Sequence, residues 1–292
     1  MQRILLTGSR GYIGSVLSPL LQQRGYSVIG LDTGYYKDEH LFSPQTFEKP
    51  LDKDIRDVSA SDLEGIDAVI HLAALSNDAV GNINAPWTDS INREATVRLA
   101  TYAKEAGVRR FLFSSSCIMY GLAKDVEVDE NTAPSPETAY AKSKVESEAA
   151  LSTLADSNFC PVYLRNGTIY GPSPSMRLDT VLNSLTASAV TTGRVVVLGD
   201  GSPWRPVCHV EDVARYFIHL LEADEKLVCN QAYNCGNDSI NMQVRDLAEL
   251  VARVTGSEVQ IMNGPETDKR SYKARFAKFS DAFPEFEFLW DV

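Results

Sequence analysis

The sequence predicts an α/β protein built on a doubly wound parallel sheet, with a smaller α/β region towards the C-terminus. Short apolar runs alternate with helical patterns up to residue 171, and a glycine-rich turn follows the first of these runs. After Pro172 the regular alternation stops. We therefore expect a first domain at 1–171, with returning segments at about 207–236, and a smaller domain at 172–206 and 237–292.

The composition limits the classes of function. A formal net charge of -11 argues against a nucleic-acid partner, although local amides and arginines can still hold a small phosphate ligand. The five cysteines are scattered without a metal-binding spacing, which fits a reducing compartment, and we expect no metal site. The first apolar run is too short for a signal peptide, and no run approaches the ~20 residues of a membrane span. A soluble cytoplasmic protein with no membrane partner is expected.

Residues 3–32 have the pattern of a βαβ unit. A buried strand at 3–7 leads into a glycine-rich turn, an amphipathic helix ends at Gly25, and a second strand at 26–31 ends at Asp32. The glycines let the backbone approach a pyrophosphate, and the helix N-terminus supplies unpaired N–H groups and positive potential. This Rossmann-type turn predicts dinucleotide contacts from Gly8, Gly11, Tyr12, Ile13 and Gly14.

Asp32 predicts which dinucleotide binds. Its carboxylate can accept hydrogen bonds from a ribose diol, and it would repel a 2′-phosphate. The next residues, Thr33 and Gly34, bring no cation. We therefore predict NAD in preference to NADP.

Further cofactor contacts are expected in the elements that follow. After an irregular excursion at 33–53, a short strand is expected to end around 54–57, beside the adenine, and a buried strand at 68–74 ends in small residues that leave room for a cofactor. His71 in that strand is predicted to be structural. A helix at 86–107 and a strand at 110–113 follow. The candidate contacts here are Asp54, Ile55, Leu72, Ala73, Ala74, Asn92 and Ser114.

The candidate chemistry lies in Tyr140 and Lys144. We predict a helix at 136–154, with Ser135 as the N-cap and Pro136 in the first position. Residues four apart then project from one face. A cation beside a phenol lowers the phenol pKa, which makes a tyrosine usable as an acid or base near neutral pH.

The remaining elements are expected in and around the smaller region. Strands are predicted at 162–165, 195–198 and 231–235, and helices at 178–191, 209–221 and 244–254. A polar loop at 76–81 lies after a strand, where open α/β sheets bind ligands. Arg205 and Arg270 are candidate ligand contacts in this region, and each has an alternative. Arg205 can instead stack on Trp204, and Arg270 can instead be a solvated loop residue.

Taken together, these residues resemble the extended short-chain dehydrogenase/reductase family, in its NAD-dependent nucleotide-sugar epimerase/dehydratase branch. The resemblance rests on the motifs Gly8/Gly11/Gly14, Asp32, Asp54-Ile55, 71–74, Ser116, Tyr140/Lys144, 170–172, and Arg205 ahead of 209–213. It implies that Ser116 and Tyr140 contact the sugar hydroxyl being oxidised, and that Lys144 holds the nicotinamide ribose and lowers the tyrosine pKa. It implies a nucleoside diphosphate sugar as ligand and allows a homodimer. The implied substrate contacts are Ser76, Asn77, Ser116, Cys117, Thr168, Arg205 and Arg270, with the two arginines on the diphosphate.

Two departures from the family pattern bear on the reaction. The related 4,6-dehydratases carry an Asp-Glu pair after the catalytic hydroxyl, and here those positions are Cys117 and Ile118. The Asn that family members frequently carry before the Tyr-Gly-Pro segment is Thr168 here, which removes one diphosphate contact that the family pattern would supply. Because the Asp-Glu pair is missing and Asp32 points to NAD, we favour an NAD-dependent epimerase that transiently oxidises a sugar hydroxyl to a ketone. The alternatives are a nucleotide-ketosugar reductase or sugar dehydrogenase of the same fold, and a non-catalytic nucleotide-binding protein.

Overall fold

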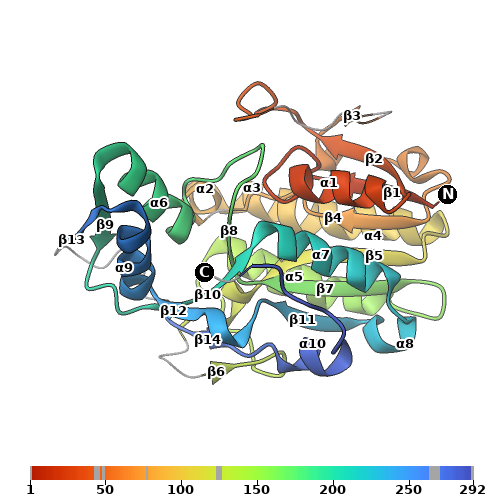
Figure 1. Cartoon of the computed structure of the whole chain (residues 1–292). Helices are drawn as coiled ribbons and strands as arrows, with labels where there is room; N and C mark the ends of the chain where they lie inside the picture. Colours follow the sequence, from red (N-terminus) through yellow and green to blue (C-terminus); the bar gives the residue numbers. More distant parts are fainter. Residues whose placement is uncertain are drawn as a thin grey trace.

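The structure is a computed structural model that describes residues 2–42, 47, 50–76, 78–122, 127–262 and 270–290 (Figure 1). Within them, a seven-stranded sheet has the order β11-β7-β5-β4-β1-β2-β3, and every pairing in it is parallel. The strands are β1 (Arg3–Thr7), β2 (Ser27–Asp32), β3 (Leu51–Asp52), β4 (Ala68–His71), β5 (Arg110–Ser116), β7 (Cys160–Asn166) and β11 (Gln231–Cys235). The strand order reverses direction between β1 and β4, so the predicted doubly wound Rossmann-type sheet is confirmed.

Helices cover both faces of this sheet (Figure 1). On one face, α1 (Gly14–Gln23) and α7 (Val210–Glu222) pack on side chains such as Ile4 of β1. On the other, α4 (Ala95–Glu105) and α5 (Ala139–Leu154) pack on the neighbouring side chain, Leu5. Because successive strand residues point to opposite faces, one short apolar run supplies both cores.

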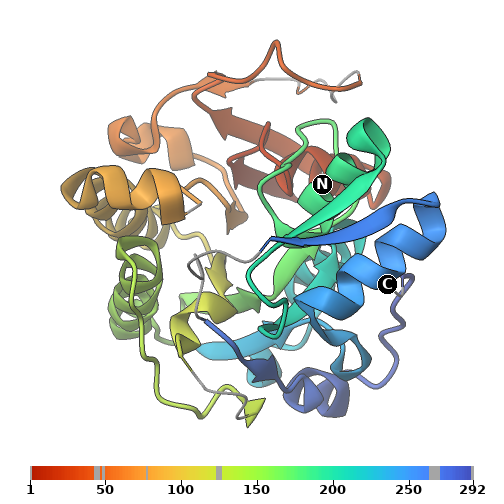
Figure 2. The same cartoon turned by 90° about the vertical axis from the view of Figure 1, so that its left-hand side faces the viewer.

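A third hydrophobic cluster lies outside the main sheet, in the part that faces the viewer in Figure 2. It is built from α6 (Val181–Thr192), α9 (Val244–Thr255), β9 (Arg194–Leu198) and the adjoining strand β10 (Trp204–His209). β9 pairs with β13 (Glu258–Met262), and β10 lies between β8 (Thr168–Tyr170) and β12 (Asn241–Gln243). This cluster supports a smaller unit, whose boundaries stay a prediction.

Short elements complete the described chain. The remaining strands are β6 (Glu127–Val128) and β14 (Lys273–Ala274), which pair with each other. The remaining helices are α2 (Asp78–Ile83), α3 (Ala85–Asp89), α8 (Glu225–Val228) and α10 (Ala277–Ala282). Single helical turns occupy η1 (Ile55–Asp57), η2 (Ala60–Leu63), η3 (Ser90–Glu94), η4 (Cys117–Tyr120) and η5 (Asp238–Ile240).

Several predicted boundaries differ from the structure. The helix expected from residue 136 begins at Ala139, because the Thr138 hydroxyl accepts a hydrogen bond from the Ala141 N–H (3.1 Å) and caps it. Ser135 is not the cap, since it lies three residues before Thr138, and its N–H donates to the Met119 carbonyl (2.8 Å). The strand expected at 68–74 ends at His71. The loop expected at 76–81 contains the start of α2.

Two other segments also differ. The helix expected at 86–107 is interrupted by the π-turn η3, which carries Asn92. The short strand expected to end around 54–57 is β3, and Asp54 caps the turn that follows it by accepting from the Arg56 N–H.

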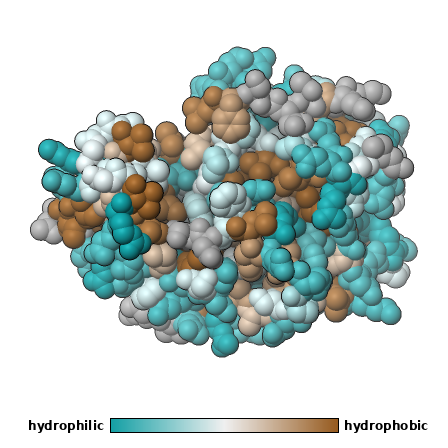
Figure 3. All heavy atoms as spheres, in the orientation of Figure 1, coloured by the Kyte–Doolittle hydropathy of each residue, from teal (hydrophilic) through white to brown (hydrophobic). Residues whose placement is uncertain are grey.

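The outer surface mixes polar and apolar side chains (Figure 3). Apolar residues gather on the left of that view, over the part that holds α6 and α9, where Val190 and Val254 are exposed. Among the described residues, no helix is both long and apolar enough to cross a membrane.

Candidate active site

The glycine turn between β1 and α1 has the shape that a dinucleotide needs. Gly8 has a φ of +68° and donates its N–H to the Leu31 carbonyl at 2.8 Å. A Cβ on Gly8 would lie 2.8 Å from the Ala73 backbone nitrogen. Gly11 donates to the Gly8 carbonyl (3.0 Å), and α1 begins at Gly14. The turn therefore brings bare backbone and a helix N-terminus to one place, which fits a pyrophosphate.

Asp32 lies at the end of β2, as predicted. Its carboxylate accepts hydrogen bonds from the N–H groups of Arg10 (3.1 Å) and Gly34 (2.8 Å). The structure also places a cation here that the sequence reasoning missed, because the Arg10 guanidinium folds back towards Gly34 and lies 2.6 Å from Asp52. Asp52 pairs with this cation, and the selection of NAD over NADP by Asp32 stays a prediction.

The other predicted cofactor residues surround the same edge of the sheet. Leu72 and Ala73 donate their N–H groups to the Thr7 hydroxyl, both at 3.2 Å, which ties β4 to the glycine turn. Tyr12 donates its hydroxyl to the Gly171 carbonyl (2.7 Å). Ile13 and Ala74 are partly buried beside them. Their contacts with a cofactor stay predictions.

Three predicted cofactor residues are engaged with protein groups. Asn92 clamps the backbone of Leu75 on both sides (2.8 and 3.1 Å) and donates to the Ser143 hydroxyl of α5. The Ser114 hydroxyl accepts from Asn166 (2.9 Å). Asp54 is paired with Arg56, next to the buried Ile55. These contacts position the walls of the site.

The three candidate catalytic residues come together. Tyr140 lies near Ser116, which ends β5 and whose hydroxyl lowers the Tyr140 pKa, and it lies one turn before Lys144 on α5. Lys144 is buried, donates to the Ser114 carbonyl (2.6 Å) and lies 5.5 Å from the centre of the Tyr140 ring. A phenol, a hydroxyl and an ammonium group therefore converge at the carboxyl end of the sheet, where open α/β folds act on ligands.

The electrostatics of Tyr140 differ from the expectation. Burial raises the pKa of the Tyr140 phenol to about 12. The charge of Arg177 and the nearby Ser116 hydroxyl lower this pKa, whereas the charge of Asp78 raises it. The sequence reasoning assigned the lowering to Lys144, but burial lowers the pKa of Lys144 itself to about 7. His71 is structural, as predicted: it is fully buried between the hydroxyls of Thr7 and Thr96 at 2.6 and 2.7 Å.

Sequence reasoning missed Arg177. It follows β8 and donates to both the carbonyl and the hydroxyl of Ser76 (3.3 and 3.2 Å), while its guanidinium also pairs with Asp179 (2.8 Å). The one feature of the sequence that could have pointed to Arg177 is its position shortly after Gly171-Pro172. That segment has no regular hydrophobic periodicity, so it predicted no element there. The structure thus brings a cation to the predicted substrate residue Ser76 and to Tyr140.

The two predicted diphosphate arginines are adjacent. Arg205 donates to the Arg270 carbonyl and to the Trp204 carbonyl (2.9 Å). Arg270 is paired with Asp78 of α2 at 2.5 Å, so it reaches from the smaller region to the edge of the main sheet. Thr168 is half-buried in β8, opposite Val207. Asn77 lies outside the described residues.

Cys117 is directed away from the site surface. Its thiol is fully buried, donates to the Arg165 carbonyl (3.0 Å) and lies 3.7 Å from the Asn234 side chain. Burial raises its thiol pKa. The Cys117 side chain therefore has no exposed surface for the substrate contact that the sequence predicted.

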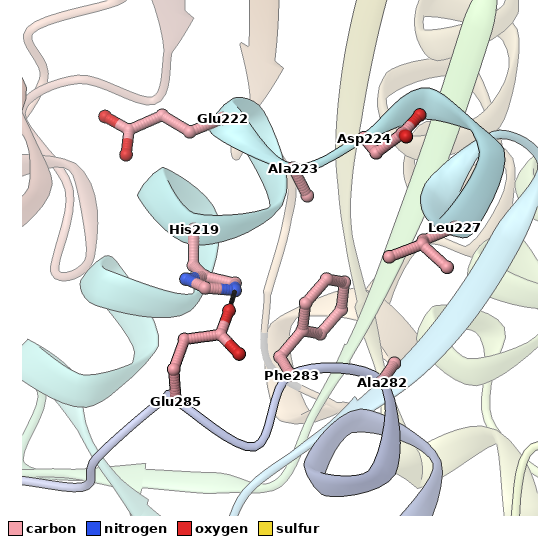
Figure 4. Close-up of a pocket in the computed structure, with 8 residues that line it drawn as sticks. All are labelled: His219, Glu222, Ala223, Asp224, Leu227, Ala282, Phe283 and Glu285. Carbon is pink, nitrogen blue, oxygen red and sulfur yellow. Dashed lines mark ion pairs between the residues drawn. The ribbon is translucent and has the colours of Figure 1, made fainter.

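A separate pocket opens at the C-terminal end of α7 (Figure 4). It has a volume of about 270 Å³ and is lined by His219, Glu222 and Phe283, among others. The His219 ring points towards the Glu285 carboxylate, 3.3 Å away (Figure 4). No predicted site residue lines this pocket, which is distinct from the Tyr140 site.

Fold and site together define a dinucleotide-binding α/β protein in which Ser116, Tyr140 and Lys144 lie together at the carboxyl end of the sheet. The model of the NAD dependent epimerase/dehydratase family matches residues 4–236, and the chain belongs to that family. NAD is accordingly its cofactor, and the bare glycine turn, Asp32 and Lys144 fit it.

The relatives include both kinds of enzyme that the family name contains. The chain is 29% identical to a UDP-glucose 4-epimerase of Mycolicibacterium smegmatis, over 87% of this chain and 83% of that protein. It is 26% identical to the dTDP-D-glucose 4,6-dehydratase of Homo sapiens, over 90% and 77%. The solved structure of MoeE5 in complex with UDP-glucuronic acid and NAD superposes with a TM-score of 0.85 at 26% identity, covering 99% of this chain and 94% of that one.

Proposed function

We propose that this protein is a nucleotide-sugar epimerase that transiently oxidises a sugar hydroxyl to a ketone. The observation that carries the proposal is an intact Ser116/Tyr140/Lys144 group next to a position that cannot support elimination. A 4,6-dehydratase needs an acid and a base after the catalytic hydroxyl. Here the first position is the buried thiol of Cys117 and the second is Ile118, which has no titratable group.

Proton transfer in the proposed reaction belongs to Tyr140. When bound, NAD supplies the acceptor and later the donor of the hydride. The Tyr140 oxygen accepts the proton of the sugar hydroxyl, and the nearby Ser116 hydroxyl lowers the Tyr140 pKa. After the ketone has rotated to present its other face, the same phenol returns the proton to the sugar oxygen. The reaction therefore neither gains nor loses a proton. Positive charge near the phenol favours its ionised form, and Arg177 supplies part of it.

The proposed substrate is a nucleoside diphosphate sugar. Arg205 and Arg270 lie next to each other, and planar guanidinium groups match phosphate oxygens in a bidentate way. Similarity to a UDP-glucose 4-epimerase and to a protein solved with UDP-glucuronic acid supports this class. Arg270 exchanges its pairing with Asp78 for the diphosphate in this scheme.

The function is tested with purified protein and UDP-sugars, without added cofactor. The expected result is an equilibrium mixture of two epimers by NMR, together with NAD released on denaturation and identified by mass spectrometry. A product lighter by one water would show a dehydratase. Turnover only with added reduced cofactor would show a reductase. Either outcome would overturn the proposal.

Replacing Arg205 with Ala tests the substrate class. We expect KM for the nucleotide sugar to rise far more than kcat falls, because the guanidinium contributes binding that ground state and transition state share. Steady-state kinetics measure both constants. Arg253→Ala, an exposed arginine near the end of α9, is the control and should change neither. If free sugars react as well as nucleotide sugars, the substrate class is wrong.

A further inference from the structure

Lys144 is a buried cation without a direct ionic partner among the described residues. Lys144 is only 3% exposed, and its ammonium group donates a hydrogen bond to the Ser114 carbonyl at 2.6 Å. The ammonium also lies 4.6 Å from the centre of the Phe113 ring. Burial disfavours the charged form of such a group. A compensating charge is therefore needed nearby if Lys144 is to work as an ammonium ion.

Glu148 lies one helical turn beyond Lys144 on α5, where a carboxylate can supply the compensating negative charge. Tyr140, Lys144 and Glu148 follow one another at intervals of four residues on α5, so they form one row on a single helix face. Glu148 is 8% exposed, and Arg165 of β7 holds its carboxylate through three hydrogen bonds, at 3.1, 3.2 and 2.7 Å. Arg165 is itself anchored by the Tyr120 hydroxyl (3.0 Å).

The other ionisable groups around Lys144 do not supply a negative charge. His71, from β4, is neutral because burial lowers its pKa to about 3. Tyr163, which faces Glu148 from β7, is neutral because burial raises its pKa. Arg177 and Asp78 face Tyr140 from the other side. Glu148 is the group that raises the Lys144 pKa against the effect of burial.

We propose that Glu148, fixed by Arg165, is the positioning residue that keeps Lys144 charged for binding the NAD ribose. The inference rests on the role that the proposed function gives to Lys144. Arg165 holds the carboxylate in place from the far side, so the row Tyr140–Lys144–Glu148 works as a unit although only its first member touches the proposed sugar hydroxyl.

The sign of the pH effect follows from the charges. The Lys144 pKa is about 7, so the ammonium form, and with it tight NAD binding, is present below that pH and lost above it. Removing the negative charge of Glu148 lowers this pKa further. We expect the midpoint for loss of NAD affinity to move to lower pH by roughly one unit in Glu148→Gln, the lower end of what a close charge produces. Near the wild-type midpoint this is about a fivefold weaker Kd, because the charged fraction of Lys144 falls from about one half to about one in eleven.

The measurement is calorimetric titration with NAD across a pH series, for the wild type and three variants. Glu146→Gln is the matched control, since Glu146 lies two residues away on the same helix, with a 57% exposed side chain paired to Arg93 at 3.4 Å. It should keep the wild-type midpoint. Breaking a buried ion pair can unfold a protein, so the double variant Glu148→Met/Arg165→Met replaces both charges with apolar groups, which is often tolerated.

The double variant keeps the test decisive when Glu148→Gln fails to fold. We expect it to fold and still to show a midpoint at lower pH, because Glu148, whose negative charge raises the Lys144 pKa, is replaced by an uncharged residue. A purely structural role predicts the wild-type midpoint in every folded variant, and that result would overturn the inference. Failure of the epimerase assay with shifted binding midpoints would instead leave the inference standing and remove the proposed reaction.

Discussion

Tyr140→Phe is expected to lower kcat by ~10²–10⁴-fold while NAD remains bound, because general acid–base catalysis contributes about that much. The change keeps the ring and its packing on α5 and removes the phenolic oxygen, which is the group assigned to proton transfer. Single-turnover kinetics with a nucleotide sugar measure the loss, and NAD released on denaturation shows that the site is loaded.

Tyr102→Phe is the control for loss of a phenolic oxygen elsewhere. Tyr102 lies on α4, partly buried against the same face of the sheet. We expect it to keep normal turnover. A folded, NAD-loaded Tyr140→Phe protein with near-normal turnover would place the proton acceptor on another residue, and the proposed mechanism would fail even though the fold is right.

Gly8→Ala is expected to reduce both stability and NAD affinity. Two costs add at this position. The φ of +68° is a left-handed conformation, which costs an L-residue ~1–2 kcal/mol. The new Cβ would lie 2.8 Å from the Ala73 nitrogen, and such overpacking against rigid backbone costs about 1–3 kcal/mol more. Urea unfolding measures the change, provided that the m-value stays constant.

Gly107→Ala separates these two costs. Gly107 also has a left-handed φ, +82°, but a Cβ there would have no atom within 4 Å. Only the conformational cost applies, so we expect a loss of ~1–2 kcal/mol and unchanged NAD binding in calorimetry. Equal destabilisation by the two substitutions would show that the close approach of Gly8 to the Leu72–Ala73 backbone, just after β4, does not constrain the cofactor turn.

The sequence by itself determined the features whose residues are close together in the chain. Apolar runs of strand length and the glycine turn predicted the βαβ unit and hence the doubly wound sheet, because these patterns reflect local geometry. The spacing of Tyr140 and Lys144 predicted one helix face for the same reason. The family resemblance, which the family model confirms, also rests on such short motifs.

Only the tertiary structure decided which charges surround those motifs. Arg177 reaches Ser76 across 101 residues, and Arg270 reaches Asp78 across 192, so no local pattern could pair them. Cys117 follows the candidate catalytic residue Ser116 in sequence, yet the chain turns its thiol into the interior. Arg165 meets Glu148 because β7 packs under α5. A pKa depends on burial and on every nearby charge, and these are set when distant segments pack together.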